Sequence, residues 1–326
     1  MNLDDKEQNQ MAEIQYFIDN QNCLWISNNA EEISEEKINQ LSQILEKAEN
    51  KNKRLYLNHS NLIDKYENLD VIIPNNIETF FYRITFRNCI KRIYVPASVK
   101  KITISPSSDY YVEEHSVEFI VSEKNENFVS VKGSIYTKDF KTLIYSAQKK
   151  GIPFLIDSRC EEIADGCKLF VDKKLYFDTT SSNITPNLKT INFRGLISNS
   201  DKLEIPEGVE TLKKGFWFIT KSCAKQTLYV PSTVKKIEKN CISKYKISKK
   251  NKTYASYKND LYSSDFKTFY AGQKKNLKLK NGCENVYLSD TECEKLFLPK
   301  SVKNIFELDS TLENIRFVVN KKNPYF

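Results

Sequence analysis

The residues of this chain that could do chemistry are eight cysteines, two histidines and many carboxylates. The cysteines lack the C-x-x-C spacing with which a structural zinc site usually begins: six residues separate Cys160 from Cys167, and nine separate Cys283 from Cys293. Neither histidine stands in a pattern typical of a catalytic base or a metal ligand. The sequence therefore predicts no metal and no cofactor.

Known catalytic and nucleotide-binding strings are missing as well. The chain has no P-loop, nucleophile elbow, H-E-x-x-H or G-x-G-x-x-G string, and its eight glycines leave little material for a phosphate-binding loop. One enzymatic alternative stays open, because two of the abundant carboxylates could act as general acid and base. Most carboxylates are simply solvated, so the sequence predicts a protein that is not an enzyme.

A short string recurs along the chain, with the pattern apolar-x-apolar-Pro-x-x-Val-x-x-Ile. Five copies are marked by a proline and have an apolar residue six positions later: Pro74, Pro96, Pro206, Pro231 and Pro299. Two further copies keep the spacing without proline, from Phe154 to Ile163 and from Leu277 to Val286. Neighbouring prolines lie 22 or 25 residues apart, which is typical of a solenoid in which each repeat forms one coil.

The string predicts a strand, a turn and a second buried segment in each coil. Residues alternate between the two faces of a strand, so the two apolar strand residues point inward and the residue between them points outward. Proline ends the strand because it has no N–H to donate to the ladder. Cys160 and Cys283 stand where other copies have Val, which indicates small, buried, reduced thiols.

A longer unit lies between the short copies and occurs twice. The first runs from Asn125 to Thr142 and the second from Asn251 to Thr268, at a constant offset of 126 residues. A third copy begins at Val319. We infer that a whole block of the chain has been duplicated.

The strings Val95–Ile102 and Ile205–Leu212, together with the unit Asn125–Thr142, resemble BspA-type leucine-rich repeats over roughly residues 65–326. The resemblance implies a leucine-rich-repeat solenoid, mainly β, with a parallel sheet on the concave face and irregular turns on the convex face. It also implies protein binding and adhesion, with host or surface proteins as partners and the cell surface as location. It implies no catalysis.

The first fifty residues differ from the repeats and predict a separate domain. They hold eleven acidic and three basic residues, and residues 31–50 have an apolar stripe at helical spacing without Gly or Pro. We expect an acidic N-terminal α-helical cap over residues 1–50 and a solenoid over 51–326, with longer inserted units at about 117–150 and 245–276. One apparent strand, Leu188–Phe193, has no place in this scheme.

Charge and hydropathy bear on partners and location. The chain carries +8 overall, so the residues after position 50 carry +16, and anionic partners such as polyanions or nucleic acid are the alternative to a protein partner. Nucleic acid ranks lower, because no RNA-binding motif with interleaved aromatic residues is recognisable. The sequence shows neither a signal peptide nor a membrane span, which predicts the cytoplasm.

The outward residue of each predicted strand forms the candidate binding column. It is apolar or aromatic in five of seven copies, and Tyr94, Tyr229 and Phe297 are its rings. Cations in or beside the column complete the predicted site: Arg92, Lys278 and Lys295. Rings beside cations suit protein recognition. Alternatively, aromatic and β-branched residues simply favour strands and stack between neighbouring coils.

Overall fold

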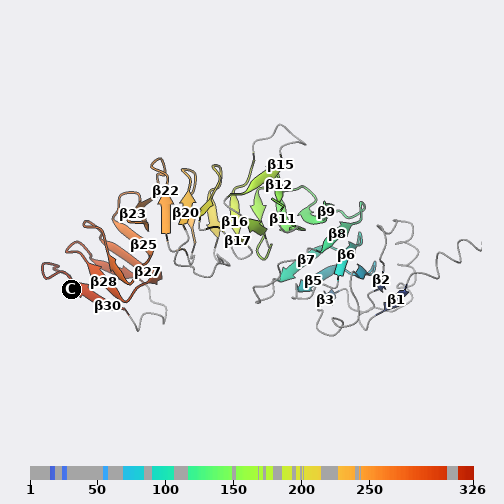
Figure 1. Ribbon diagram of the computed structural model, residues 1–326, viewed down its shortest axis with the longest axis horizontal. Coiled ribbons are helices and arrows are strands. Elements are labelled where there is room, and N and C mark those ends of the chain that lie inside the picture. The colour runs from blue at the N-terminus through green and yellow to red at the C-terminus, as the bar shows by residue number, and fades with distance from the viewer. Residues whose placement is uncertain are drawn as a thin grey trace, which may run out of the picture. The chain divides into compact units, whose positions relative to one another are not determined.

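The computed structural model describes this chain as a β-solenoid built of short strands (Figure 1). The residues that it describes are 15–18, 24–27, 54–57, 69–83, 90–105, 117–148, 152–167, 169–171, 174–178, 186–192, 196–198, 200, 202–213, 227–238, 242, 244–306 and 315–326. They belong to two compact units, unit 1 (residues 1–152) and unit 2 (residues 153–326). Within the described residues, no helix is long and apolar enough to cross a membrane.

In unit 1, each coil gives one strand to each of two parallel ladders. The first ladder holds the strands that precede the turn: β4 (Leu69–Ile72), β6 (Ile90–Val95) and β8 (Glu118–Val121). The second ladder holds the strands on the return side: β3 (Arg54–Leu57), β5 (Thr79–Arg83) and β7 (Lys101–Ser105). Two antiparallel strands extend the first ladder beyond β4: β1 (Gln15–Ile18) and β2 (Leu24–Ser27).

Unit 2 repeats this arrangement. Its first ladder is interrupted and falls into three groups of paired strands: β12 (Leu155–Asp157) with β15 (Tyr176–Asp178); β18 (Lys202–Glu204), β20 (Thr227–Val230) and β22 (Lys244–Ile247); and β26 (Asn276–Lys278), β28 (Lys295–Leu298) and β30 (Arg316–Val319). Its second ladder falls into two groups of paired strands: β13 (Glu162–Ile163), β16 (Thr190–Asn192), β19 (Thr211–Lys213) and β21 (Lys236–Ile237); and β25 (Thr268–Gln273), β27 (Asn285–Glu292) and β29 (Asn304–Phe306). A short third pair is parallel too: β14 (Leu169–Val171) and β17 (Leu196–Ser198).

The two longer units insert antiparallel hairpins between the coils. They comprise β9 (Phe128–Val131), β10 (Ser134–Thr137) and β11 (Thr142–Tyr145) in unit 1, and β23 (Tyr254–Tyr257) and β24 (Asp260–Ser263), followed by β25, in unit 2. The copies agree even in unfavourable backbone geometry, because Phe140 and Phe266 both have positive φ, at 62° and 60°. The duplication inferred from the sequence therefore extends to the backbone.

The inward positions of both ladders form the core. Leu203, Leu228 and Leu296 on the first ladder are 0% exposed, and so are Ile191 and Leu212 on the second. Burying one such side chain stabilises the fold by about 1.5–3 kcal/mol. A single coil has no interior of its own, so each coil buries these side chains only by stacking on the next.

Three asparagines fasten the longer units to the turn of the preceding coil. The Nδ2 of Asn251 donates to the carbonyl oxygens of Pro231 (2.8 Å) and Val234 (3.0 Å), while its Oδ1 accepts from the backbone N–H of Thr253 and Tyr254. The corresponding amides of two other asparagines make the same pair of contacts: Asn125 to Pro96 and Val99, and Asn323 to Pro299 and Val302. We call this contact the asparagine clamp.

Two features differ from the sequence expectation. The return side of the solenoid is not made of irregular turns, because the Val-x-x-Ile segments pair into the second ladder. The apparent strand Leu188–Phe193 finds its place there: Leu188 takes the Val position, and Ile191 pairs with Leu212 as β16 beside β19. Its coil begins at β15, whose degenerate sequence hides the repeat.

The N-terminal region also differs where the structure describes it. The predicted helix over residues 31–50 lies outside the described residues, as does the predicted boundary at residue 50. The described part of residues 1–50 is the antiparallel pair β1–β2, which joins β4 through β2. The end of the first ladder is thus extended by strands, and a helical cap is not supported.

The asparagine clamp gives a stability prediction. Changing Asn251 to Ala leaves two carbonyl oxygens and two N–H groups without their partner, so we expect a loss of about 1–3 kcal/mol in the free energy of unfolding. Urea unfolding followed by circular dichroism measures it. Asn276→Ala, on an exposed strand position, is the control and should stay near the wild-type value. Equal stability of both variants would show that the clamp contributes nothing.

Candidate binding surface

Two of the predicted binding residues, Arg92 and Tyr94, lie on β6 and are buried. Arg92 is 4% exposed and Tyr94 is 3% exposed, and Ile93 and Val95 between and beside them are buried as well. The prediction that Arg92 and Tyr94 face solvent is therefore wrong. Alternation along a strand tells which face a side chain takes, but it does not tell whether that face is covered.

Arg92 instead forms a buried ion pair within the first ladder. Its Nε and Nη2 donate to the two carboxylate oxygens of Asp70 on β4, at 2.9 and 2.8 Å. Burial raises the pKa of Asp70, although the hydrogen bond and charge of Arg92 oppose the rise. A bidentate pair of this kind orients both side chains, so Arg92 has a structural role that its sequence position did not reveal.

Of the other four predicted residues, Lys278, Lys295 and Phe297 lie together on the paired strands β26 and β28, whereas Tyr229 lies on β20, in another group of the first ladder of unit 2. Tyr229 on β20 is 36% exposed, Lys278 on β26 is exposed, and Lys295 and Phe297 on β28 are half-buried. The Nζ of Lys278 stands 5.2 Å from the centroid of the Phe297 ring. On the other side, Val318 of β30 is the register partner of Phe297.

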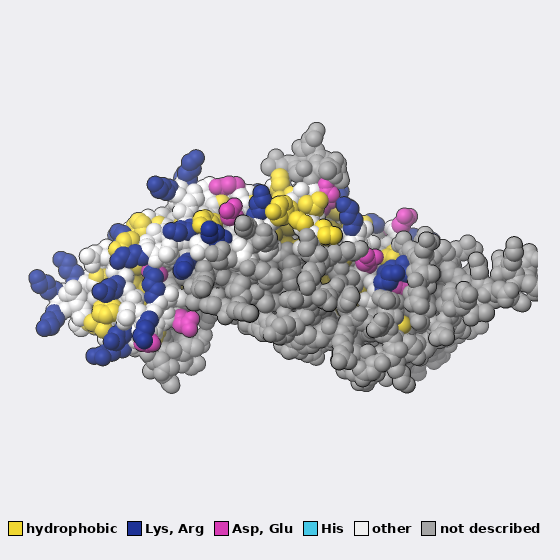
Figure 2. Space-filling view, viewed as in Figure 1, with side chains coloured by type: hydrophobic (Ala, Val, Ile, Leu, Met, Phe, Trp, Pro, Cys, Tyr) yellow, Lys and Arg dark blue, Asp and Glu magenta, His cyan; other side chains and the backbone are white. Residues whose placement is uncertain are grey.

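Five cations stand on the strands from β20 to β30, and the nearest acidic residue on a paired strand is Glu204 of β18. The strands β20, β22, β26, β28 and β30 contain no Asp or Glu, and their cations are Lys244, Lys246, Lys278, Lys295 and Arg316. None of the five forms an ion pair with a described residue. We call the outward side chains of these five strands the basic face. Lys and Arg side chains gather over the C-terminal coils on the side drawn in Figure 2.

The second ladder of unit 2 carries an aromatic stack that the sequence analysis missed. The rings of Tyr270 and Tyr287 stack at 5.7 Å, and those of Tyr287 and Phe306 stack at 4.9 Å. Tyr287 and Phe306 are 38% and 39% exposed. A signal was present, because each ring directly follows the inward-facing apolar residue of its strand (Phe269, Val286 or Ile305) in three successive coils. Stacked rings cover one another's faces and leave mainly their edges to solvent.

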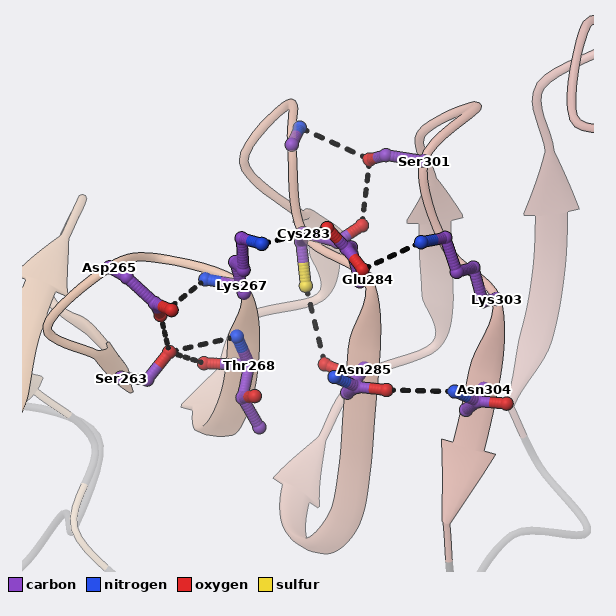
Figure 3. A network of polar contacts seen from close by, with 11 residues as sticks. Ser263, Asp265, Lys267, Thr268, Cys283, Glu284, Asn285, Ser301, Lys303 and Asn304 are labelled. Carbon is purple, nitrogen blue, oxygen red and sulfur yellow. Dashed lines mark hydrogen bonds and ion pairs between the residues drawn. The ribbon is translucent and has the colours of Figure 1, made fainter.

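Beside this stack, polar contacts join one coil to the next (Figure 3). Glu284 accepts a hydrogen bond from the Nζ of Lys303 at 2.8 Å and lies 3.4 Å from that of Lys267; the contact with Lys303 is the main cause of the lowered pKa of Glu284. The thiol of Cys283 donates to the carbonyl oxygen of Asn285, and burial raises the pKa of this thiol to about 11. A protonated, buried thiol is a poor nucleophile and a poor metal ligand.

Buried carboxylates are the other groups that could do chemistry. Asp260 lies against Lys274, whose Nζ contacts both carboxylate oxygens at 2.6 Å and the carbonyl oxygen of Lys258 at 2.7 Å. Burial raises the pKa of Asp260. The pair fixes the turn of the β23–β24 hairpin. Among the residues that the structure describes, no three His, Cys, Asp or Glu side chains come together as metal ligands would.

Comparisons with known proteins find structures but no sequence relatives. No protein-family model matches the chain, and neither does any curated protein. A leucine-rich repeat protein from Eubacterium ventriosum is similar over 73% of this chain, with 11% identity and a TM-score of 0.34. This chain spans 56% of the length of that protein.

Two further structures are similar over most of this chain. They are the pneumococcal vaccine antigen PcpA (82% of this chain and 83% of that one, 14% identity, TM-score 0.26) and a leucine rich cell surface protein from Faecalibacterium prausnitzii (89% and 72%, 13% identity, TM-score 0.27). Such TM-scores are too low to argue function. The BspA-type assignment therefore stays a prediction, and so does the compartment.

The buried pair gives a second prediction. Arg92→Ala leaves the Asp70 carboxylate buried without its cation, which should cost about 3–5 kcal/mol in the free energy of unfolding. The double change Arg92→Met with Asp70→Leu removes both charges and should recover most of that loss. Thermal and urea unfolding measure both variants. A loss below about 1 kcal/mol for Arg92→Ala, as is usual for an exposed pair, would contradict the structural role.

Proposed function

We propose that this chain is a non-enzymatic scaffold that binds a protein partner through the basic face of unit 2. One observation carries the proposal: Phe297 stands among Lys278, Lys295 and Arg316 on paired strands that contain no acidic residue, and Tyr229 is a second exposed ring, beside Lys246. Aromatic rings bury a large area at low cost in conformational entropy, and cations around them steer a partner of opposite charge.

Stacking between coils is the competing explanation for aromatic residues on a solenoid, and it does not account for Tyr229. This ring is 36% exposed, and its register partners are Glu204 on β18 and Lys246 on β22 rather than another ring. It makes no ring–ring contact with a described residue. Its strand β20 is paired on both sides, by β18 and β22, so a partner meets a surface that is already organised.

The finer form of the proposal follows from the resemblance to BspA-type repeats. In that form the scaffold is an adhesion protein, and its partner is a host or surface protein. Cell-surface display then replaces the cytoplasm as the working location. Protease treatment of intact cells that produce the protein, followed by immunoblotting, tests the location: loss of the signal supports surface display, and full protection supports the cytoplasm.

The test of the basic face compares two matched double variants. Tyr229→Ser with Phe297→Ser removes the rings of the basic face, while Tyr287→Ser with Phe306→Ser removes two exposed rings of the aromatic stack on the other ladder. Quantitative mass spectrometry compares the proteins retained by wild type and by each variant. We expect partners to be lost from the first variant and kept by the second, with ten- to hundredfold weaker binding, about the usual effect of losing a binding hot spot.

Circular dichroism must show equal folding of both variants, so that lost binding reports the surface. Retention of the same proteins by all three chains would refute the basic face as the binding surface. Loss from the aromatic-stack variant alone would move the site to the second ladder.

A further inference from the structure

The charges of unit 2 are arranged differently on the two ladders. On the second ladder, the residue directly after the Val position of one coil pairs with its equivalent in the next coil. Lys235 thus lies 2.9 Å from Glu210, and Lys303 lies 2.8 Å from Glu284. The same position of unit 1 holds a pair at 3.5 Å, Lys100 with Glu78. At this position of the second ladder, each of these lysines is therefore neutralised by a glutamate of the neighbouring coil.

The strands β26, β28 and β30 contain no such pair, although Lys275 and Glu294, which directly precede β26 and β28, lie 3.4 Å apart. Lys295 and Arg316 are direct register partners on β28 and β30, and like charges opposite one another destabilise a sheet. The uncompensated charge is relieved when an anionic partner lies across the strands.

The apolar residues of the basic face restrict the chemistry of that partner. Phe297 sits between the ammonium of Lys278 and the side of Val318, with Lys295 on its own strand and Arg316 diagonally opposite. Because Lys278 lies over the ring, Phe297 does not offer an open face for a nucleobase to stack on. Sulfated or phosphorylated chains satisfy the cations but leave Phe297 and Val318 without an apolar contact.

Spacing fits a peptide better. Neighbouring parallel strands lie about 4.8 Å apart, so the cations that flank Phe297 stand roughly 5–10 Å from one another across the sheet. In an extended peptide, side chains on one face recur about every 7 Å. If an apolar residue of the peptide contacts Phe297, the peptide residues two positions before and two positions after it lie near Lys278 on one side and near Arg316 on the other.

We infer that the partner presents an extended acidic segment of the form acid-x-apolar-x-acid to Lys278, Lys295, Phe297 and Arg316. The inference rests on the proposed function and names the chemistry of its partner. The apolar side chain covers Phe297 and Val318, and the two carboxylates pair with the cations around them. Attraction between unlike charges also makes the binding sensitive to salt.

A labelled peptide tests this inference with the full chain. The probe carries two Glu-Ser-Leu-Ser-Glu segments and a fluorescein label, and its binding is measured by fluorescence anisotropy at low ionic strength. Peptides with Gln in place of Glu, or Ala in place of Leu, separate the charged from the apolar contribution. We expect each replacement to weaken binding, and the doubly replaced peptide to show none.

Two matched charge variants locate the site. Lys278→Gln with Lys295→Gln should raise the dissociation constant about tenfold, as expected for the loss of two partly exposed ion pairs. Lys235→Gln with Lys303→Gln removes the same net charge from the second ladder and should change the dissociation constant less than about twofold. Equal losses in both variants would show that only net charge matters and would overturn the inference.

Two other results would overturn it as well. If heparin or single-stranded oligodeoxythymidylate binds at concentrations at which the peptide does not, the basic face recognises polyanions rather than an acidic peptide. Failure of every probe, while the Tyr229 and Phe297 double variant still loses its protein partners, would refute the acidic segment and leave the proposed function standing. Loss of the partners from neither ring variant would instead refute the proposed function.

Discussion

Every feature of this protein depends on the burial of apolar side chains between successive coils. A coil of 22 or 25 residues encloses no interior of its own, so Leu203 or Leu212 leaves water only when the coils on either side are in register. The backbone ladders then fix that register residue by residue. The outward side chains inherit the same order, and this is why rings and cations from segments far apart in the sequence become neighbours.

Most of the architecture that could be predicted from the sequence followed from the spacing of the repeats. Proline-marked strands, inward alternation and the duplicated long unit all rest on local rules of spacing, and the structure contains each of them. These rules missed features that depend on residues far apart in the sequence. The coil that begins at β15 has no proline directly after its strand and has a long connection to β16, so Leu188–Phe193 looked like a strand without a coil.

The binding column shows the same limit. Tyr94 and Tyr229 hold equivalent positions in the repeat, yet one is 3% exposed and the other 36%. Burial of the outer side of a ladder depends on what else packs there, which no repeat pattern contains. Arg92 likewise looked like a surface cation, because its partner Asp70 stands in the preceding coil. The residues that did fall together, Lys278, Lys295 and Phe297, do so on the paired strands β26 and β28 of unit 2.

The asparagine clamp and the paired backbone geometry of the two long units have a consequence for how this chain reaches its fold. Because β8 and β22 are followed by nearly equivalent turns, hairpins and clamps, either hairpin could dock on the strand that belongs to the other. Correct assembly therefore depends on proximity along the chain, since closing a short loop is faster than closing one of more than a hundred residues. A solenoid of this kind is kept in order during folding by the sequence of its coils rather than by differences between them.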